Sequence, residues 1–127
     1  MDLGQIIMDK SIFEEFVTEA VKDLPKFFKK KMENISIVIE DFPSLDIQNK
    51  MHHGPYGLLG LYQGVPYTKR NTWYANVMPD KIIIYQKPIE NFAKTEPEIK
   101  KLVRKVVMHE IGHYYGLSEE ELRKAGV

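Results

Sequence analysis

The sequence contains no cysteine among its 127 residues. Disulfides and thiolate ligands are therefore excluded, and any metal ion must be held by histidine, aspartate or glutamate. A chain without disulfides suits a reducing compartment, so we expect a cytoplasmic protein. The length fits one modest hydrophobic core, and we predict a single domain over residues 1–127.

The sequence also has no excess of either charge, since 18 basic and 18 acidic residues give a formal net charge of zero. No overall field then attracts nucleic acid or an acidic membrane. No apolar stretch approaches the length of a membrane span, and the N-terminus lacks the charged and apolar regions of a secretion signal. These absences predict a small monomer or simple oligomer with no nucleic-acid and no membrane partner.

Short periodic patterns divide the chain into helices and strands. Ser11 and Glu14 have the spacing of a capping box, and the apolar residues behind them predict a first helix as far as Leu24. Pro25 is placed to begin a second, short helix. Residues 44–56 have a weak pattern that predicts a loop with one helical turn. The apolar runs typical of strands occupy residues 35–39, 58–63 and 81–85.

The clearest helix lies near the C-terminal end of the sequence. Thr95, with Pro97 and Glu98 behind it, predicts where this helix starts, and apolar residues follow one face to about Tyr115. Gly116 is placed to end the helix in the left-handed conformation. The order helix, strand, strand, strand, helix predicts an α+β domain with helices against a small sheet.

This helix carries the pattern His-Glu-x-x-His at residues 109–113. His109 and His113 are one turn apart, so their rings project to the same side, which is how two imidazoles bind one zinc ion. With four histidines in the chain, the pattern arises by chance in about one sequence of this size in a hundred. Two imidazoles on the buried side of a helix also need a partner. We therefore predict a Zn²⁺ site and prefer it to two structural histidines.

Glu110 lies beside His109 in the sequence but projects about 100° further around the helix. Its carboxylate is poorly placed to share the ligand set and well placed to reach a water at the metal. There it can act as general base while the water attacks a carbonyl, and then pass the proton to the leaving amine. The alternative is an ordinary exposed glutamate, and the flanking histidines favour the base.

A hydrolytic zinc site needs a third protein ligand and one open position. The near candidates are Glu119, Glu120 and Glu121, although acids in the first turn of a helix need no metal to explain them. Glu121 follows Ser118 by three residues and is accounted for by a capping box. Glu119 follows Gly116 by three residues, where a reversed chain returns toward the histidines. The spacing favours Glu119, and Glu120 stays open as the alternative.

Five of these residues form one pattern, which consists of His109, Glu110, His113, Gly116 and Glu119. This pattern resembles the metzincin spacing His-Glu-x-x-His-x-x-Gly-x-x-(His/Asp) of the zincin metallopeptidases, except that the last position is a glutamate. More closely, the chain resembles the minimal zincin-like metallopeptidases, a small prokaryotic family long described as a domain of unknown function. This resemblance extends to residues 58–66 and 79–82 and so covers most of the chain. It implies a compact zincin-like fold, zinc held by the two histidines and Glu119, and Glu110 as the catalytic residue.

The predicted architecture is a mixed sheet of three to four strands packed against an N-terminal helix and the C-terminal helix that carries the motif. Eight residues, 120–127, follow Glu119, so we expect neither the methionine turn of metzincins nor a later helix with a glutamate ligand. We expect a more open cleft than in larger zincins, and a partner that completes the cleft stays an open alternative.

The resemblance also implies where a peptide would bind, because zincin substrates lie extended along a sheet edge. We predict that residues 58–63 form this edge, since Gly57 and Gly60 allow a close backbone approach. Tyr62, Tyr67 and Arg70 would reach the cleft from there, although packing of the tyrosines and solvation of the arginine explain each of them singly.

Two functions follow from these predictions. The first is a zinc-dependent metallopeptidase that acts on short or unfolded peptides. The alternative is a catalytically silent domain of zincin fold that binds zinc or a partner protein. A metal-dependent RNA-processing enzyme would need a basic surface, which the net charge of zero argues against.

Overall fold

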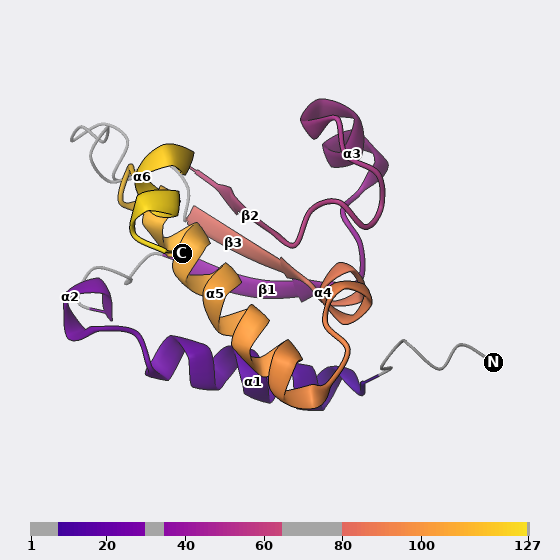
Figure 1. Cartoon of the computed structure of the whole chain (residues 1–127). Helices are drawn as coiled ribbons and strands as arrows, with labels where there is room; N and C mark the ends of the chain where they lie inside the picture. The colour runs from indigo at the N-terminus through magenta and orange to yellow at the C-terminus, as the bar shows by residue number, and fades with distance from the viewer. Residues whose placement is uncertain (1–7, 30–34, 65–79, 127) are drawn as a thin grey trace.

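The computed structural model describes residues 8–29, 35–64 and 80–126, which form a small sheet with helices packed against it (Figure 1). Neighbouring strands follow the order β1-β3-β2, in which β1 runs parallel and β2 antiparallel to the central β3. The strands are β1 (Ile35–Glu40), β2 (Gly60–Gln63) and β3 (Asp80–Tyr85). The predicted α+β architecture with a small mixed sheet is therefore confirmed.

The central position of β3 follows from its composition. Ile82, Ile83 and Ile84 are each at most 2% exposed, and a run of β-branched residues buried on both faces suits a central strand. β2 begins two residues later than predicted, at Gly60. The Tyr85 amide nevertheless donates a hydrogen bond to the Leu59 carbonyl at 3.0 Å, so the pairing continues just beyond the strand.

The first helix, α1, spans Lys10–Lys22 and starts before Ser11. The predicted capping box of Ser11 and Glu14 is therefore wrong. The Asp9 carbonyl already accepts a hydrogen bond from the Phe13 amide at 3.1 Å, which places Ser11 inside the first turn. After Pro25 comes the short helix predicted there, α2 (Lys26–Lys29).

Two further helices depart from the sequence predictions. α3 (Leu45–Met51) replaces most of the predicted loop, and its start is capped by Ser44, whose hydroxyl accepts a hydrogen bond from the Ile47 amide at 3.2 Å. No residue of α3 is buried, so this helix has no apolar period to reveal it. α4 (Gln86–Phe92) follows β3 directly and was not predicted at all.

The polar interior of α4 explains why its pattern is hidden. Gln86 and Glu90 are buried on the side where a helix usually carries apolar residues. The Gln86 amide nitrogen donates to the Met8 carbonyl at 2.9 Å, and the Met8 amide donates to Glu90 Oε2 at 2.9 Å. Lys87 Nζ lies 3.3 Å from the other oxygen of Glu90. These contacts fix the chain just before α1.

The long helix α5 (Glu96–Tyr114) crosses one face of the sheet with α1 beside it, and α6 (Glu119–Lys124) lies at its end (Figure 1). α3 and α4 lie at the opposite end, where β2 begins (Figure 1). Buried apolar residues from α1, β3 and α5 form the core, among them Phe13, Val17, Ile82, Ile84, Val103, Val107 and Ile111. Within the described ranges, no helix is both long enough and apolar enough to cross a membrane.

Candidate metal centre

The start of α5 agrees with the sequence prediction. The Thr95 hydroxyl accepts a hydrogen bond from the Glu98 amide at 3.3 Å, and a proline occupies the first turn. From this start, the helical period carries residues 109–113 into the last turns of α5. There His109 and His113 lie beside the beginning of α6, and Glu110 lies beside β2.

The end of α5 is a Schellman motif built on Gly116. This glycine has the left-handed φ of 84° that other residues avoid. Its amide donates to the His113 carbonyl at 2.9 Å, and the Leu117 amide donates to the Gly112 carbonyl at 3.0 Å. The predicted left-handed helix end is confirmed. The chain reverses here, and α6 starts three residues later, beside the last turns of α5.

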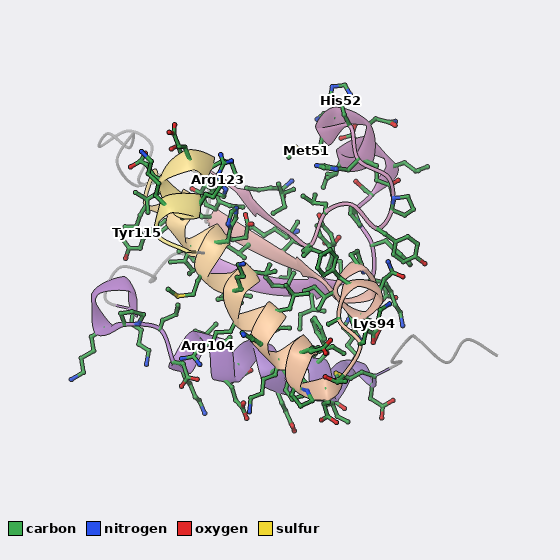
Figure 2. All side chains as sticks on the ribbon, viewed as in Figure 1. Met51, His52, Lys94, Arg104, Tyr115 and Arg123 are labelled. Carbon is green, nitrogen blue, oxygen red and sulfur yellow. The ribbon has the colours of Figure 1, made fainter. Side chains whose placement is uncertain are left out.

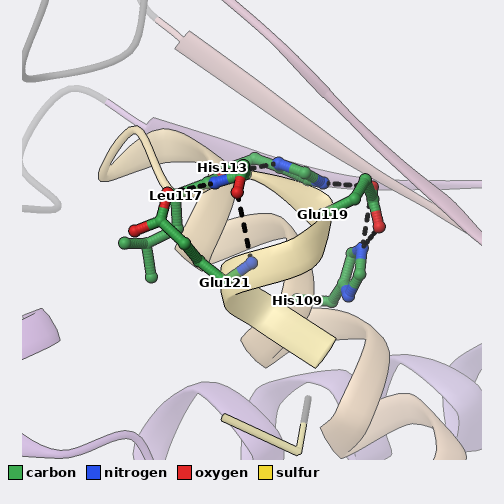
Figure 3. A network of polar contacts seen from close by, with 6 residues as sticks. His109, His113, Leu117, Glu119 and Glu121 are labelled. Carbon is green, nitrogen blue, oxygen red and sulfur yellow. Dashed lines mark hydrogen bonds and ion pairs between the residues drawn. The ribbon is translucent and has the colours of Figure 1, made fainter. Parts of the chain in front are cut away.

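His109 and His113 project side by side from α5, with ring centroids 4.9 Å apart. The carboxylate of Glu119, from the first residue of α6, reaches both rings (Figure 3). Its Oε1 lies 2.7 Å from His113 Nε2 and 3.1 Å from His109 Nε2. Each ring is only about one-quarter exposed, at 26% for His109 and 24% for His113. The structure thus gathers into one cluster two partly buried imidazoles and one carboxylate, that of Glu119, whose side chain is 68% exposed.

The three consecutive glutamates of α6 have different partners. Glu120 Oε1 lies 3.6 Å from Lys124 Nζ on the exposed side of the helix. Glu121 and Ser118 form the predicted capping box, with hydrogen bonds of 3.1 and 3.2 Å. Glu119 alone of the three contacts the histidines. Capping chemistry and chain reversal therefore separate three acids that are adjacent in sequence.

The hydrogen bond on the far side of His113 determines what its inner nitrogen can do. Nδ1 lies 3.1 Å from the Leu117 carbonyl oxygen, which only accepts hydrogen bonds, so Nδ1 must carry the proton. In the neutral ring, Nε2 then directs a lone pair at the Glu119 carboxylate. Two acceptors this close repel each other unless a cation lies between them or the ring gains a second proton. A carbonyl behind the ligating imidazole is also a common feature of metal sites.

The charge state of Glu119 is consistent with this arrangement. Partial burial acts to raise its pKa, but with a proton on each Nε2 and no metal ion, the hydrogen bonds from His109 and His113 and their positive charge outweigh burial and lower the pKa of this carboxyl below its usual value. The carboxylate is therefore ionised at neutral pH. When a metal ion takes the place of the Nε2 protons, two neutral imidazoles and one carboxylate form a donor set of hydrolytic zinc sites.

The spacing of these donors fits zinc as well. Nitrogen and oxygen ligands at about 2.0–2.2 Å from a tetrahedral ion lie about 3.3 Å from one another. The Glu119 oxygens lie 2.7 to 3.1 Å from the two Nε2 atoms. On the side of Glu119, a widening of a few tenths of an ångström would therefore bring these distances to those of zinc ligands.

Glu110 occupies a different position beside the same cluster. Its side chain is 7% exposed, and one ligand atom each of His109, Glu110 and His113 lies within 4.8 Å of the others. Burial raises the pKa of Glu110, and the nearby charge of Glu119 adds to this, whereas the two histidines and a hydrogen bond from the Tyr62 backbone amide act to lower it. The result is a buried carboxyl with a raised pKa, held against β2 and next to the histidines.

These groups open into a cavity of about 790 Å³ between α5 and β2. The cluster and the turn at residues 116–119 line one end of this cavity. Met51 of α3 and Phe92 of α4 line the other. A cavity of this volume can hold several residues of an extended peptide.

Gly60 of β2 packs tightly against α5. A Cβ atom there would lie 2.7 Å from Val106 Cγ1 and 3.3 Å from Glu110 Cγ. The close approach suggested by this glycine is thus made by side chains of α5 and not by a substrate. Among the residues that the structure describes, β2 pairs with β3 alone, so residues 60–63 do lie at an edge of the sheet.

The tyrosines near the site are engaged in packing and hydrogen bonds. The Tyr62 hydroxyl donates to Asp80 Oδ2 at 2.9 Å. Tyr114 is 2% exposed and packs edge-on against the Tyr62 ring, with centroids 6.0 Å apart. Tyr67 and Arg70, which we expected at the cleft, lie outside the described residues.

A family model described as a zincin-like metallopeptidase matches residues 32–127. The chain belongs to this family. The match includes the whole sheet and the cluster on α5 and α6, and it confirms the resemblance noted in the sequence. Among solved structures, a conserved hypothetical protein from Thermus thermophilus is similar in fold, with a TM-score of 0.56 over 93% of this chain and 98% of that one, at 18% identity. No curated protein matches the sequence.

Sequence analysis of this zincin-like chain missed the importance of Gly112, one of the two variable positions of the motif. A Cβ atom at Gly112 would overlap the Leu122 side chain, which is 1% exposed. α6 therefore packs directly on the backbone of α5, and we expect this contact to set the position of Glu119. A glycine inside a helix lowers the stability of the helix by about 1 kcal/mol relative to alanine. A glycine within the predicted helix therefore indicated that this position has a packing role.

Gly112→Ala is accordingly expected to push α6 away from α5 and to weaken zinc binding by roughly 10- to 100-fold, as for other residues that support metal ligands. Competition with a chromogenic chelator measures this affinity. Gly54→Ala is the matched control, because a Cβ at Gly54 meets nothing within 4 Å. Adding Leu122→Ala to Gly112→Ala should restore part of the affinity. An unchanged affinity in Gly112→Ala would show that this contact does not position Glu119.

Proposed function

We propose that this chain is a zinc-dependent metallopeptidase that hydrolyses peptide bonds in short or unfolded peptides. The observation that carries the proposal is the position of the buried carboxyl of Glu110 beside the cluster of His109, His113 and Glu119, in the wall of a cavity of about 790 Å³. A binding site alone would need the cluster. A hydrolytic site also needs a base next to it and room for a peptide.

His109, His113 and Glu119 would hold the zinc ion, and three protein ligands leave a fourth position for water and substrate. When bound, zinc supplies a Lewis acid that polarises the peptide carbonyl and acidifies water. The Leu117 carbonyl keeps the proton of His113 on Nδ1 and so presents Nε2 as a ligand. The sequence alternative, Glu120, is paired with Lys124 and does not contact the histidines.

Glu110 would act as the general base. Its carboxylate would take a proton from the attacking water while the new carbon–oxygen bond forms, and deliver that proton to the amine nitrogen as the carbon–nitrogen bond breaks. Burial raises its pKa, which makes it a stronger base than an exposed glutamate. The hydrogen bond from the Tyr62 amide would orient the carboxylate during both transfers.

The edge of β2 would bind the substrate backbone. The Tyr85 amide donates to the Leu59 carbonyl, and the register pairs Gly60 with Ile84. Hydrogen-bonded pairs alternate along an antiparallel ladder, so Gly60 directs its N–H and C=O away from β3. Since Gly60 also lines the cavity, an extended peptide can pair with these two groups.

A direct test uses protein stripped of metal with a chelator and then reloaded with one equivalent of zinc. Both forms are incubated with a library of unstructured peptides, and the products are identified by mass spectrometry. The proposal predicts cleavage by the reloaded form alone. Zinc binding without cleavage of any peptide would instead support the catalytically silent domain. The cytoplasmic location and the single-domain organisation stay predictions from the sequence.

A further inference from the structure

We propose that the end of the cavity remote from the histidines is a specificity subsite, which takes one large apolar side chain of the substrate about three residues from the cleaved bond. The proposal deepens the proposed peptidase function and rests on it. It concerns the apolar subsite, defined here by Met51, Leu58, Phe92, Leu102 and Val106, all of which line the same cavity as the metal centre.

The distance between the metal centre and the apolar subsite follows from the rise of α5, which contributes residues to both. Leu102, Val106 and His109 all line the cavity and lie on one stripe of the helix, three or four residues apart. Seven residues separate Leu102 from His109, which corresponds to about 10 Å along the helix axis. An extended peptide advances about 3.3 Å per residue. About three substrate residues therefore fit between the metal centre and Leu102.

The chemistry of the remote end is apolar and unusually exposed. The Phe92 side chain is 70% exposed and that of Met51 is 43% exposed, while Leu58 and Leu102 are partly buried. These residues come from α3, α4, α5 and the segment before β2. α3 and α4 both lie toward the end of the sheet where β2 begins (Figure 1; Met51 is labelled in Figure 2). Covering such side chains removes apolar area from water and is favourable. Lys105, which is exposed on the same stripe, adds a positive charge at the border.

The part of the cavity between the metal centre and the apolar subsite indicates that a substrate side chain occupies the subsite. The alternation of the β2–β3 ladder turns the N–H and C=O of Gly60 away from β3. Because Gly60 also lines the cavity, these two groups offer a site for an extended chain. Alternate side chains of that chain point to opposite faces. A peptide bound at both Gly60 and the metal centre would therefore direct one particular side chain onto Phe92 and Leu102, which makes the subsite selective for a position as well as for a residue type.

The test is a binding experiment in which the register is known. Peptides that carry a terminal hydroxamate, a group that binds zinc, are anchored at the metal centre of the zinc-loaded protein. Each peptide of the series has one leucine or phenylalanine among serines, at the first to fourth position from the anchor, with the anchor at either terminus. Fluorescence anisotropy gives the affinities. We expect one position, about three residues from the anchor, at which the apolar residue binds about tenfold more tightly than serine.

Phe92→Ala should remove this preference, so that the apolar peptide and the all-serine peptide bind with about equal affinity. Leu45→Ala is the matched control, because Leu45 is 75% exposed, lies on α3 and does not line the cavity. Both replaced side chains are exposed, so neither variant should unfold. A preference that is absent in the wild type, or that persists in Phe92→Ala, overturns the subsite.

The subsite and the peptidase can fail separately. If library peptides are cleaved with no apolar preference, the subsite fails and the peptidase proposal stands. If nothing is cleaved but the hydroxamate series shows a preference that depends on Phe92, the peptidase proposal fails and the cavity still selects an apolar side chain. A hydroxamate series that does not bind at all contradicts both.

Discussion

Replacing Glu110 with glutamine is expected to reduce zinc-dependent peptide hydrolysis by roughly 10²- to 10⁴-fold, the usual contribution of a general base. The amide has nearly the same shape but cannot take a proton from water. Zinc should stay bound, because Glu110 is not among the three proposed ligands. Since burial raises the pKa of this carboxyl, an uncharged side chain should also be tolerated in the fold. The readouts are kcat/KM on a cleaved library peptide and the zinc content of the same sample.

The matched control is Glu120→Gln, which makes the same chemical change on the exposed side of α6. Glu120 is 71% exposed and pairs only loosely with Lys124, at 3.6 Å, so its activity and zinc content should equal those of the wild type. Full activity in Glu110→Gln would contradict the assigned base. Joint loss of zinc and activity would instead make Glu110 a ligand.

The second large effect concerns stability and the third ligand. Zinc that binds only the folded chain stabilises it by about 4 kcal/mol when the free ion is at 1,000 times its dissociation constant. Chelation removes this stabilisation and should therefore lower the unfolding midpoint in urea. Without the cation, the Glu119 carboxylate lies only 2.7 to 3.1 Å from the two imidazoles. Urea unfolding with zinc and with chelator measures the difference.

Glu119→Gln should weaken zinc binding by about 100-fold or more, which exceeds the loss expected for a residue that only supports a metal ligand. The stabilisation of the fold by zinc should decrease accordingly. Glu120→Gln is again the control, one residue away in the same turn of α6. Equal zinc affinity in both variants would remove Glu119 from the ligand set. An unfolding midpoint that does not respond to zinc would mean that the ion is not held by the folded chain.

The features that sequence could predict are those specified by nearby residues. Thr95 and Gly116 delimit α5 through a cap and a Schellman motif, both of which act within a few residues. The contact of Glu119 with the histidines is also local, because it spans one reversal of the chain. For this reason the spacing from Gly116 could favour Glu119 over its neighbours before the structure was known.

The features that sequence could not predict depend on contacts between distant segments. α4 is hidden because Gln86 and Glu90 bind the backbone of Met8, 78 and 82 residues away, and so place polar groups where the helical pattern expects apolar ones. α3 buries no residue and thus has no period. These two helices contribute Met51 and Phe92 to the remote wall of the cavity, so the apolar subsite could be recognised only once the chain was folded.

The most direct test of the metal centre is the zinc content of the purified protein, measured by inductively coupled plasma mass spectrometry after dialysis against metal-free buffer. We predict about one zinc ion per chain in the wild type, as three protein ligands allow, and a large loss in His109→Ala. His53→Ala serves as the control, because His53 is exposed and does not line the cavity. If the wild type and His109→Ala carry the same small fraction of zinc, the cluster of His109, His113 and Glu119 is not a metal centre.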